Sequence, residues 1–141
     1  MQGNPRDRQY LYRRIVAAKA FIDSHYRGVI DIDKMAGHAC FSKFHFLRLF
    51  KQAYGMTPHQ YVTIRRIGMA KEMLRDNHSV IRTCRAVGFE SVSSFNRLFK
   101  RHSRQTPSEF AASARAVRAR TADNPLDHVP LCYIEYLHWN K

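Results

Sequence analysis

The sequence has little of what membrane-spanning, fibrous or disulfide-rich proteins require. Five prolines and six glycines among 141 residues are too few for a disordered or fibrous chain. No apolar run reaches the roughly 18 residues that span a bilayer, and the first ten residues, MQGNPRDRQY, lack the apolar segment of a signal peptide. We therefore expect a cytoplasmic protein, folded as one compact domain or as two very small subdomains that share a core.

Motifs for catalysis or metal binding are also scarce. The three cysteines, Cys40, Cys84 and Cys132, are odd in number and lack C-x-x-C spacing, which disfavours a disulfide framework. None of the eight histidines stands in a zinc-ligand arrangement with cysteine. The sequence shows neither a nucleophile paired with a base nor a glycine-rich phosphate loop. We expect no metal, no cofactor and no enzymatic activity.

Negative charge is the third deficit. Asp and Glu number 11 against 24 Lys and Arg, which gives a net charge of +13 and an isoelectric point near 10.2. The segment 34–71 contains no acid, and the segment 77–108 contains only Glu90. Such a field favours a polyanionic partner, through steering and counterion release. Solubility and a lipid surface are the alternatives, although the single Trp139 lies outside the basic segments, which weakens the lipid alternative.

One pattern is present twice. Residues 46–61 read FLRLFKQAYGMTPHQY and residues 95–110 read FNRLFKRHSRQTPSEF, an offset of 49. Ahead of each copy, apolar or small residues recur at the i, i+3, i+4, i+7 spacing of one helix face, here with an offset of 48. The change of offset predicts one extra residue in the second turn, which we assign to Glu90. The spaced residues are Ile32, Met35, Ala36 and Ala39, and then Val80, Thr83, Cys84 and Val87.

Residues suited to the N-cap position predict where the helices start. Asp31 and Ser79 precede the two short helices, and Ser42 and Ser91 precede longer helices over 43–54 and 92–103. Thr-Pro pairs then start further helices, because proline is pre-organised for the first helical position. Each copy is thus a helix-turn-helix unit, at about 31–54 and about 79–103.

Both longer helices have an apolar face and a basic face. The apolar stripes predict core residues: Phe46, Leu49, Phe50 and Ala53 in one copy, and Phe95, Leu98 and Phe99 in the other. In a DNA-binding unit of this kind the second helix enters the major groove, while the first crosses the backbone. A helical hairpin used only for packing would not need Arg and Lys at matching outer positions in both copies.

The segment between the copies predicts one long linker helix over about 58–76. Its length of about 28 Å, at ~1.5 Å per residue, is of the order of the ~34 Å between successive major grooves. Helices are also predicted at about 8–26, from the stripe that starts at Leu11, and after Pro107; the tail 116–141 has no assigned role. Residues available for the linker's interior are Tyr61, Ile64, Ile67, Ala70, Met73 and Leu74.

The residues resemble the AraC/XylS family of bacterial transcription regulators over about 8–115. The resemblance rests on AVGFESVSSFNRLFKRHSRQTPSEF, on FSKFHFLRLFKQAYGMTPHQY and on RRIGMAKEML between them. It implies an all-α domain of about seven helices, with two helix-turn-helix units that bind promoter DNA as a monomer. It further implies activation through RNA polymerase. Larger members add an N-terminal sensory domain, so the chain resembles the small members or a fragment of a larger one.

The sequence departs from the family pattern at three positions. Arg104 stands where the family usually has a glycine, which Gly55 keeps in the first copy. Either Arg104 is strained, or the turn there differs. Cys40 replaces a small glycine in the first turn, and Cys84 replaces an alanine.

Outward geometry and the family match select the site residues. Arg48 and Arg97 are the expected base readers, since Arg can donate twice to guanine; pairing with phosphate or with an internal acid is the alternative. The other candidate base contacts are Phe44, Leu47, Ser93, Ser94 and Asn96. The alternative for Phe44 is burial, and the alternative for Ser93, Ser94 and Asn96 is a solvated polar face without a DNA contact. Expected phosphate contacts are Lys43, His45, Lys51, Lys100 and Arg101.

Two functions remain open on the sequence. The first is a sequence-specific transcription regulator, with double-stranded DNA and RNA polymerase as partners. The second is a helical interaction module that binds RNA polymerase or another factor without reading DNA. The ratio of specific to non-specific affinity separates them, because only the regulator should prefer its site by ~10³ or more.

Overall fold

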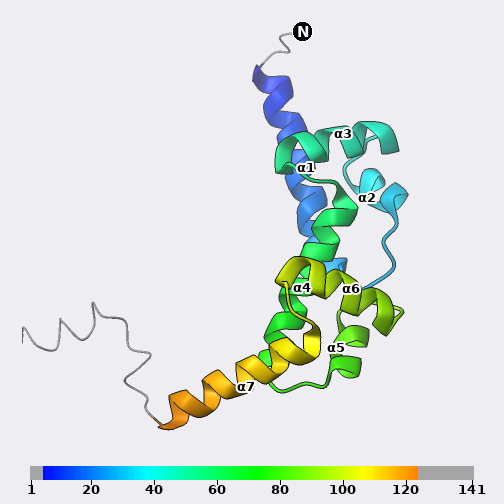
Figure 1. Cartoon of the computed structure of the whole chain (residues 1–141). Coiled ribbons are helices and arrows are strands. Elements are labelled where there is room, and N and C mark those ends of the chain that lie inside the picture. Colours follow the sequence, from blue (N-terminus) through cyan, green and yellow to red (C-terminus); the bar gives the residue numbers. More distant parts are fainter. Residues whose placement is uncertain (1–4, 124–141) are drawn as a thin grey trace, which may run out of the picture.

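The computed structural model describes residues 5–123, and the regular secondary structure in this range is all helical. The all-α expectation is confirmed, with seven helices within the described range (Figure 1). Residues 124–141, most of the tail left unassigned above, lie outside the described residues. The helices are α1 (Pro5–His25), α2 (Ile32–His38), α3 (Lys43–Tyr54), α4 (Pro58–Arg75), α5 (Val80–Ala86), α6 (Val92–Ser103) and α7 (Pro107–Asp123).

Helix starts follow the predicted caps. The side chains of Asp31, Ser42, Ser79 and Ser91 each accept a hydrogen bond from a backbone N–H in the first turn. At Thr57 the bond is reciprocal, because Gln60 also accepts from the Thr57 N–H at 2.9 Å. The first helix was predicted less well: it runs from Pro5 to His25 rather than from residue 8 to 26.

The two turns are built alike. Cys40 and Gly88, at matching positions, both have left-handed backbone, with φ of 50° and 92°. The next residue closes each turn, since the Phe41 N–H donates to the Ala36 carbonyl and the Phe89 N–H to the Cys84 carbonyl. The second turn is one residue longer, as the change of offset predicts: residues 39–42 separate α2 from α3, whereas residues 87–91 separate α5 from α6.

The exit from each longer helix is also the same. Gly55 has φ of 71° and Arg104 has φ of 58°, and each donates its N–H to the carbonyl four residues earlier. The turn after α6 therefore does not differ. Arg104 adopts the left-handed conformation that a glycine would take without steric cost.

The repeated aromatic residues form the same cluster in each copy of the pattern. Phe46 and Phe50 lie with ring centroids 5.6 Å apart, and the matching Phe95 and Phe99 show the same 5.6 Å. The aromatic that follows each Thr-Pro pair completes the cluster edge-on: Tyr61 lies 5.8 Å from Phe50, and Phe110 lies 5.6 Å from Phe99. Each copy thus builds its own aromatic core.

Helix α4 contributes to both cores. Val62 is buried in the first, with α1, α2 and α3, whereas Ile67, Ala70 and Leu74 are buried in the second, with α5, α6 and α7. Met69 packs against both. The interior prediction was wrong for Ile64, which is 41% exposed, because the buried stripe of α4 includes Val62 instead. We call the two halves the first and second subdomains.

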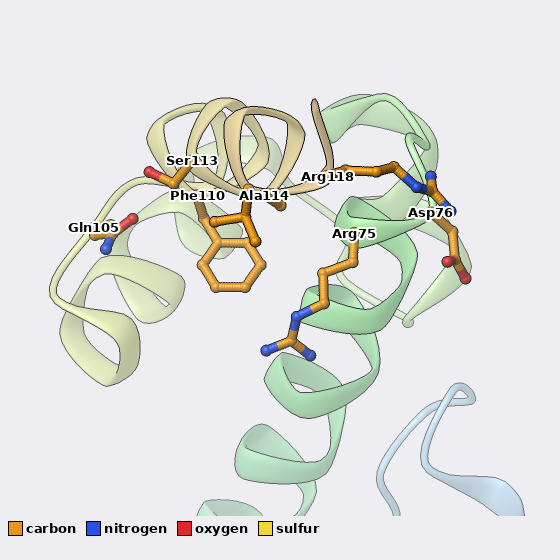
Figure 2. Close-up of a pocket in the computed structure, with 8 residues that line it drawn as sticks. Arg75, Asp76, Gln105, Phe110, Ser113, Ala114 and Arg118 are labelled. Carbon is orange, nitrogen blue, oxygen red and sulfur yellow. The ribbon is translucent and has the colours of Figure 1, made fainter. Parts of the chain in front are cut away.

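Helix α7 closes the second subdomain against the end of α4. Phe110 points from α7 towards α4, and the Arg75 guanidinium lies 5.4 Å from the centre of its ring (Figure 2). The N-terminus of α7 carries a second reciprocal cap, in which the Thr106 N–H donates to Glu109 at 2.7 Å and the Glu109 N–H donates to Thr106 at 3.3 Å.

Candidate nucleic-acid interface

Helices α3 and α6 present their polar faces away from the two cores. Their buried phenylalanines hold one face of each helix inward, so that residues two positions away, such as Arg48 and Arg97, project outward. In Figure 1 the two helices run in roughly the same direction, α3 beside the start of α4 and α6 further along it. The arrangement places the two predicted reading helices at different points along one connecting helix.

Arg48 and Arg97 occupy the same position in the two copies, and both are exposed. Among the described residues, neither guanidinium has a hydrogen bond or an ion pair. Pairing with an internal acid, the alternative raised by the sequence, does not occur within residues 5–123. Both groups are available to an external acceptor.

Two apolar residues on α3 have different environments. The Phe44 side chain is 84% exposed, so the burial considered for it is wrong. Leu47 is half-buried and packs against the first core, which leaves only part of its side chain on the outer face. An aromatic ring held in water at the start of α3 is available for an apolar contact with a partner.

The outer face of α6 is polar. Ser93 and Asn96 are exposed, whereas Ser94 is half-buried and its backbone N–H is engaged by the Ser91 cap at 3.1 Å. The two reading helices therefore differ in chemistry: α3 offers a ring and a guanidinium, and α6 offers an amide, a hydroxyl and a guanidinium.

The predicted phosphate contacts fall into two groups. Lys51 and Arg101 are exposed and have no partner among residues 5–123. The other three have partners: Lys43 pairs with Asp33 at 3.2 Å, and the His45 ring lies 5.0 Å from the Phe41 ring. The pKa of Glu109 is lowered mainly by the hydrogen bond from the Thr106 N–H, and the charge of Lys100 lowers it further. The Lys43 pair is exposed, so it costs little to exchange for a phosphate.

Two arginines with structural contacts were missed by the sequence analysis. Arg14 of α1 donates to the carbonyls of Ala39 and Cys40 and lies 4.1 Å from the centre of the Phe41 ring, which fixes the first turn. Arg66 of α4 donates to backbone carbonyls 38 and 40 residues away in the chain. No local pattern marks either contact, because both partners are distant in sequence.

The described residues also bear on metal binding and on membrane spans. Within 5–123 no group of three or more His, Cys, Asp and Glu side chains could hold a metal ion. None of the helices described is long and apolar enough to cross a bilayer.

Two helix-turn-helix units on one helix, each with an outward basic reading helix, define a double helix-turn-helix protein. A helix-turn-helix domain model matches residues 35–113, more than half of the chain. The probable transcription factor PqrA of Proteus vulgaris is 37% identical over 82 residues, which are 57% of this chain and 67% of that protein. The arabinose operon regulatory protein of Salmonella typhimurium is 36% identical over 91 residues, 64% of this chain but 31% of that protein.

Solved structures agree. The DNA-binding domain of the global transcriptional factor AdpA, in complex with a target DNA, has a TM-score of 0.71 at 25% identity, covering 75% of this chain and 96% of that one. An AraC-type regulator from Chromobacterium violaceum has a TM-score of 0.68 at 25% identity, covering 73% and 93%. The chain belongs to the AraC-type helix-turn-helix family of DNA-binding transcription regulators. It spans about a third of the length of most curated relatives that it matches.

Proposed function

We propose that this chain binds promoter DNA sequence-specifically as a monomer, with α3 and α6 in successive major grooves. The observation that carries the proposal is the matched pair Arg48 and Arg97, both exposed and unpaired within the described residues. Unpaired guanidiniums at equivalent positions of two reading helices fit two guanines in two grooves, since each can donate two hydrogen bonds to O6 and N7.

The remaining outward residues extend the reading. Asn96 can pair with an adenine through two hydrogen bonds, and Phe44 can contact a thymine methyl group. Ser93 and Ser94 lie at the start of α6, where hydroxyls reach either a base or a phosphate, and Leu47 gives Phe44 an apolar neighbour. The proposal therefore predicts an asymmetric site, because the two helices carry different side chains.

The cations on both helices fix the position of the protein without selecting a sequence. In this proposal Lys51, Lys100 and Arg101 bind phosphates, and Lys43 can exchange Asp33 for one. His45 adds a contact beside them. A net charge of +13 supports strong, salt-dependent attraction to the duplex.

The step from binding to regulation rests on the relatives. The similar AdpA domain was solved on a target DNA, and the similar curated proteins are regulators of operons. We propose that this chain acts in the cytoplasm as an activator that recruits RNA polymerase to the promoter it binds. Transcription of a reporter from the selected site, with and without the protein, tests the direction of the effect.

Selection of bound duplexes from a random pool tests the binding. The expected result is one motif with two unlike boxes about 10 base pairs apart, preferred by ~10³ or more over a scrambled duplex of equal length and composition. Equal affinity for selected and scrambled duplexes would contradict the proposal and favour an interaction module that does not read DNA.

A further inference from the structure

Helix α4 links the two subdomains, but a glycine in the middle of the helix makes this link easy to bend. Gly68 stands exposed in its interior, and a Cβ at this position would meet nothing within 4 Å, so no packing requires a glycine there. The glycine lies next to Ile67, where α4 passes from the first core to the second. Because an interior glycine lacks the conformational restriction of alanine, α4 bends more easily at this point.

A second connection runs beside α4. The loop between α1 and α2, residues 26–31, meets the turn between α5 and α6. Gly88 of that turn approaches Arg27 so closely that a Cβ on Gly88 would lie 2.3 Å from the Arg27 carbonyl oxygen. Only a glycine permits this contact between the backbones of the two subdomains.

Arg66 of α4 contacts both the loop 26–31 and the turn between α5 and α6. From α4 its Nε donates to the Tyr26 carbonyl at 2.7 Å and its Nη2 donates to the Gly28 carbonyl at 2.7 Å. The guanidinium also lies 5.5 Å from the centre of the Phe89 ring in the second turn. Burial lowers the pKa of Arg66, and the Glu90 carboxylate opposes that effect. One side chain thus contacts the loop of the first subdomain and the turn that leads directly into α6.

We propose that Arg66 is a positioning residue that sets the angle between α3 and α6, and so selects the spacing between the two DNA boxes. The inference rests on the proposed function. The contacts of Arg66 and Gly88 lie beside α4 rather than along its axis. They therefore oppose rotation of the second subdomain around α4, and α4 without them would resist that rotation less. One added base pair moves the second box by about 3.4 Å and turns it by about 35°, so a rigid pair of helices rejects it.

The test compares Arg66→Met with Arg65→Met. Both remove one charge from α4, but Arg65 pairs with Asp23 inside the first subdomain, at 3.0 Å. Affinity is measured for the two-box duplex from the random pool, for versions with one base pair inserted or deleted, and for versions with one box scrambled. In the wild-type protein and in Arg65→Met, a spacing change should weaken binding at least ~10-fold.

In Arg66→Met the spacing penalty should fall to about 2- to 3-fold, and affinity for the optimal two-box duplex should drop about 10-fold, because the effective concentration of the second reading helix falls. Single-box affinity should stay within about 2-fold. An unchanged spacing penalty, or an equal loss on one-box and two-box duplexes, would overturn the inference, since the latter is the behaviour of a phosphate contact.

A second pair of variants approaches the same contact from the other side. Gly88→Ala and Gly55→Ala both place a Cβ at positive φ, but only at Gly88 does the new atom meet the backbone of the other subdomain. Gly88→Ala should relax the spacing preference, and Gly55→Ala should keep it. The same relaxation in both variants would show general destabilisation and count against the inference.

A measurement without DNA separates this inference from the proposed function. Amide residual dipolar couplings of the two subdomains should fit one alignment tensor in the wild-type protein and in Arg65→Met, and should need two tensors in Arg66→Met. A single tensor for all three proteins would overturn the positioning role even if specific DNA binding is found. Failure of the pool selection with the expected tensors would instead count against the proposed function.

Discussion

The Tyr61 hydroxyl donates to the Asp23 carboxylate at 2.7 Å and so joins α4 to α1. The same carboxylate accepts from Lys19 at 2.7 Å and meets Arg65 at 3.0 Å. Burial raises the pKa of Asp23, but the bonds from Lys19 and Tyr61 outweigh it, so the net pKa lies below the usual value. A group at the junction of two helices is therefore coupled to the stability of the first subdomain.

The sign of that coupling predicts a pH dependence. Because the folded-state pKa is depressed, the contribution of Asp23 is present above the unfolded value near 3.9 and is lost as pH falls through the folded value. Asp23→Asn should lower the free energy of unfolding by roughly 1–2 kcal/mol at pH 7 and flatten the decline in acid. Urea denaturation at a series of pH values measures this; a parallel decline in both proteins would contradict it.

Base reading by Arg48 and Arg97 can be tested one box at a time. Arg48→Ala should relax the base preference in one box by about 1–3 kcal/mol and leave the other box intact, and Arg97→Ala should do the reverse. Pool selection with each variant measures the preference. Arg118→Ala, at an exposed arginine on α7 rather than on either reading helix, is the charge-matched control. An unchanged motif would remove that arginine from the reading role.

Lys51 should behave differently from Arg48, although the two lie on the same face of α3. Lys51→Ala should weaken binding to selected and scrambled duplexes alike and reduce the slope of log K against log salt by about 1, because one phosphate contact is lost. Affinities at several salt concentrations give the slope. A change in the selected motif, with the slope unaltered, would instead assign Lys51 to base reading.

The left-handed conformation of Arg104 costs stability that a glycine would not. Arg104→Gly should raise the free energy of unfolding by about 0.5–1 kcal/mol, measured by denaturant titration without DNA. Gly55→Ala at the equivalent position, φ 71°, should lower it by a similar amount. If Arg104→Gly proves less stable, the side chain contributes more than its backbone strain removes.

Local chemistry accounts for what could be predicted. The caps at Asp31, Ser42, Ser79 and Ser91 act within three residues, so a sequence pattern is enough to place the helix starts. The reading helices were predicted at their observed bounds for that reason. The bounds of α1 were missed by three residues at one end and one at the other, although the sequence has an asparagine directly before Pro5, a pattern typical of a helix start.

Other features depended on what packs where. Phe44 and Leu47 are both apolar and lie three residues apart, yet one is in water and the other is half-buried against the first core. Ile64, expected in the interior, is exposed, and Val62, for which nothing was expected, is buried, because the rotation of α4 between two cores decides which side chain turns inward.

By itself the sequence determined the duplication, the helices and the two basic outer faces, because periodicity, capping and charge are properties of neighbouring residues. Only the tertiary structure decided how the two units are held relative to each other. Arg66 reaches carbonyls 38 and 40 residues away, and Gly88 lies against Arg27 of the other subdomain. Such contacts form only when segments that are distant in the sequence meet in space, so no local sequence pattern can predict them.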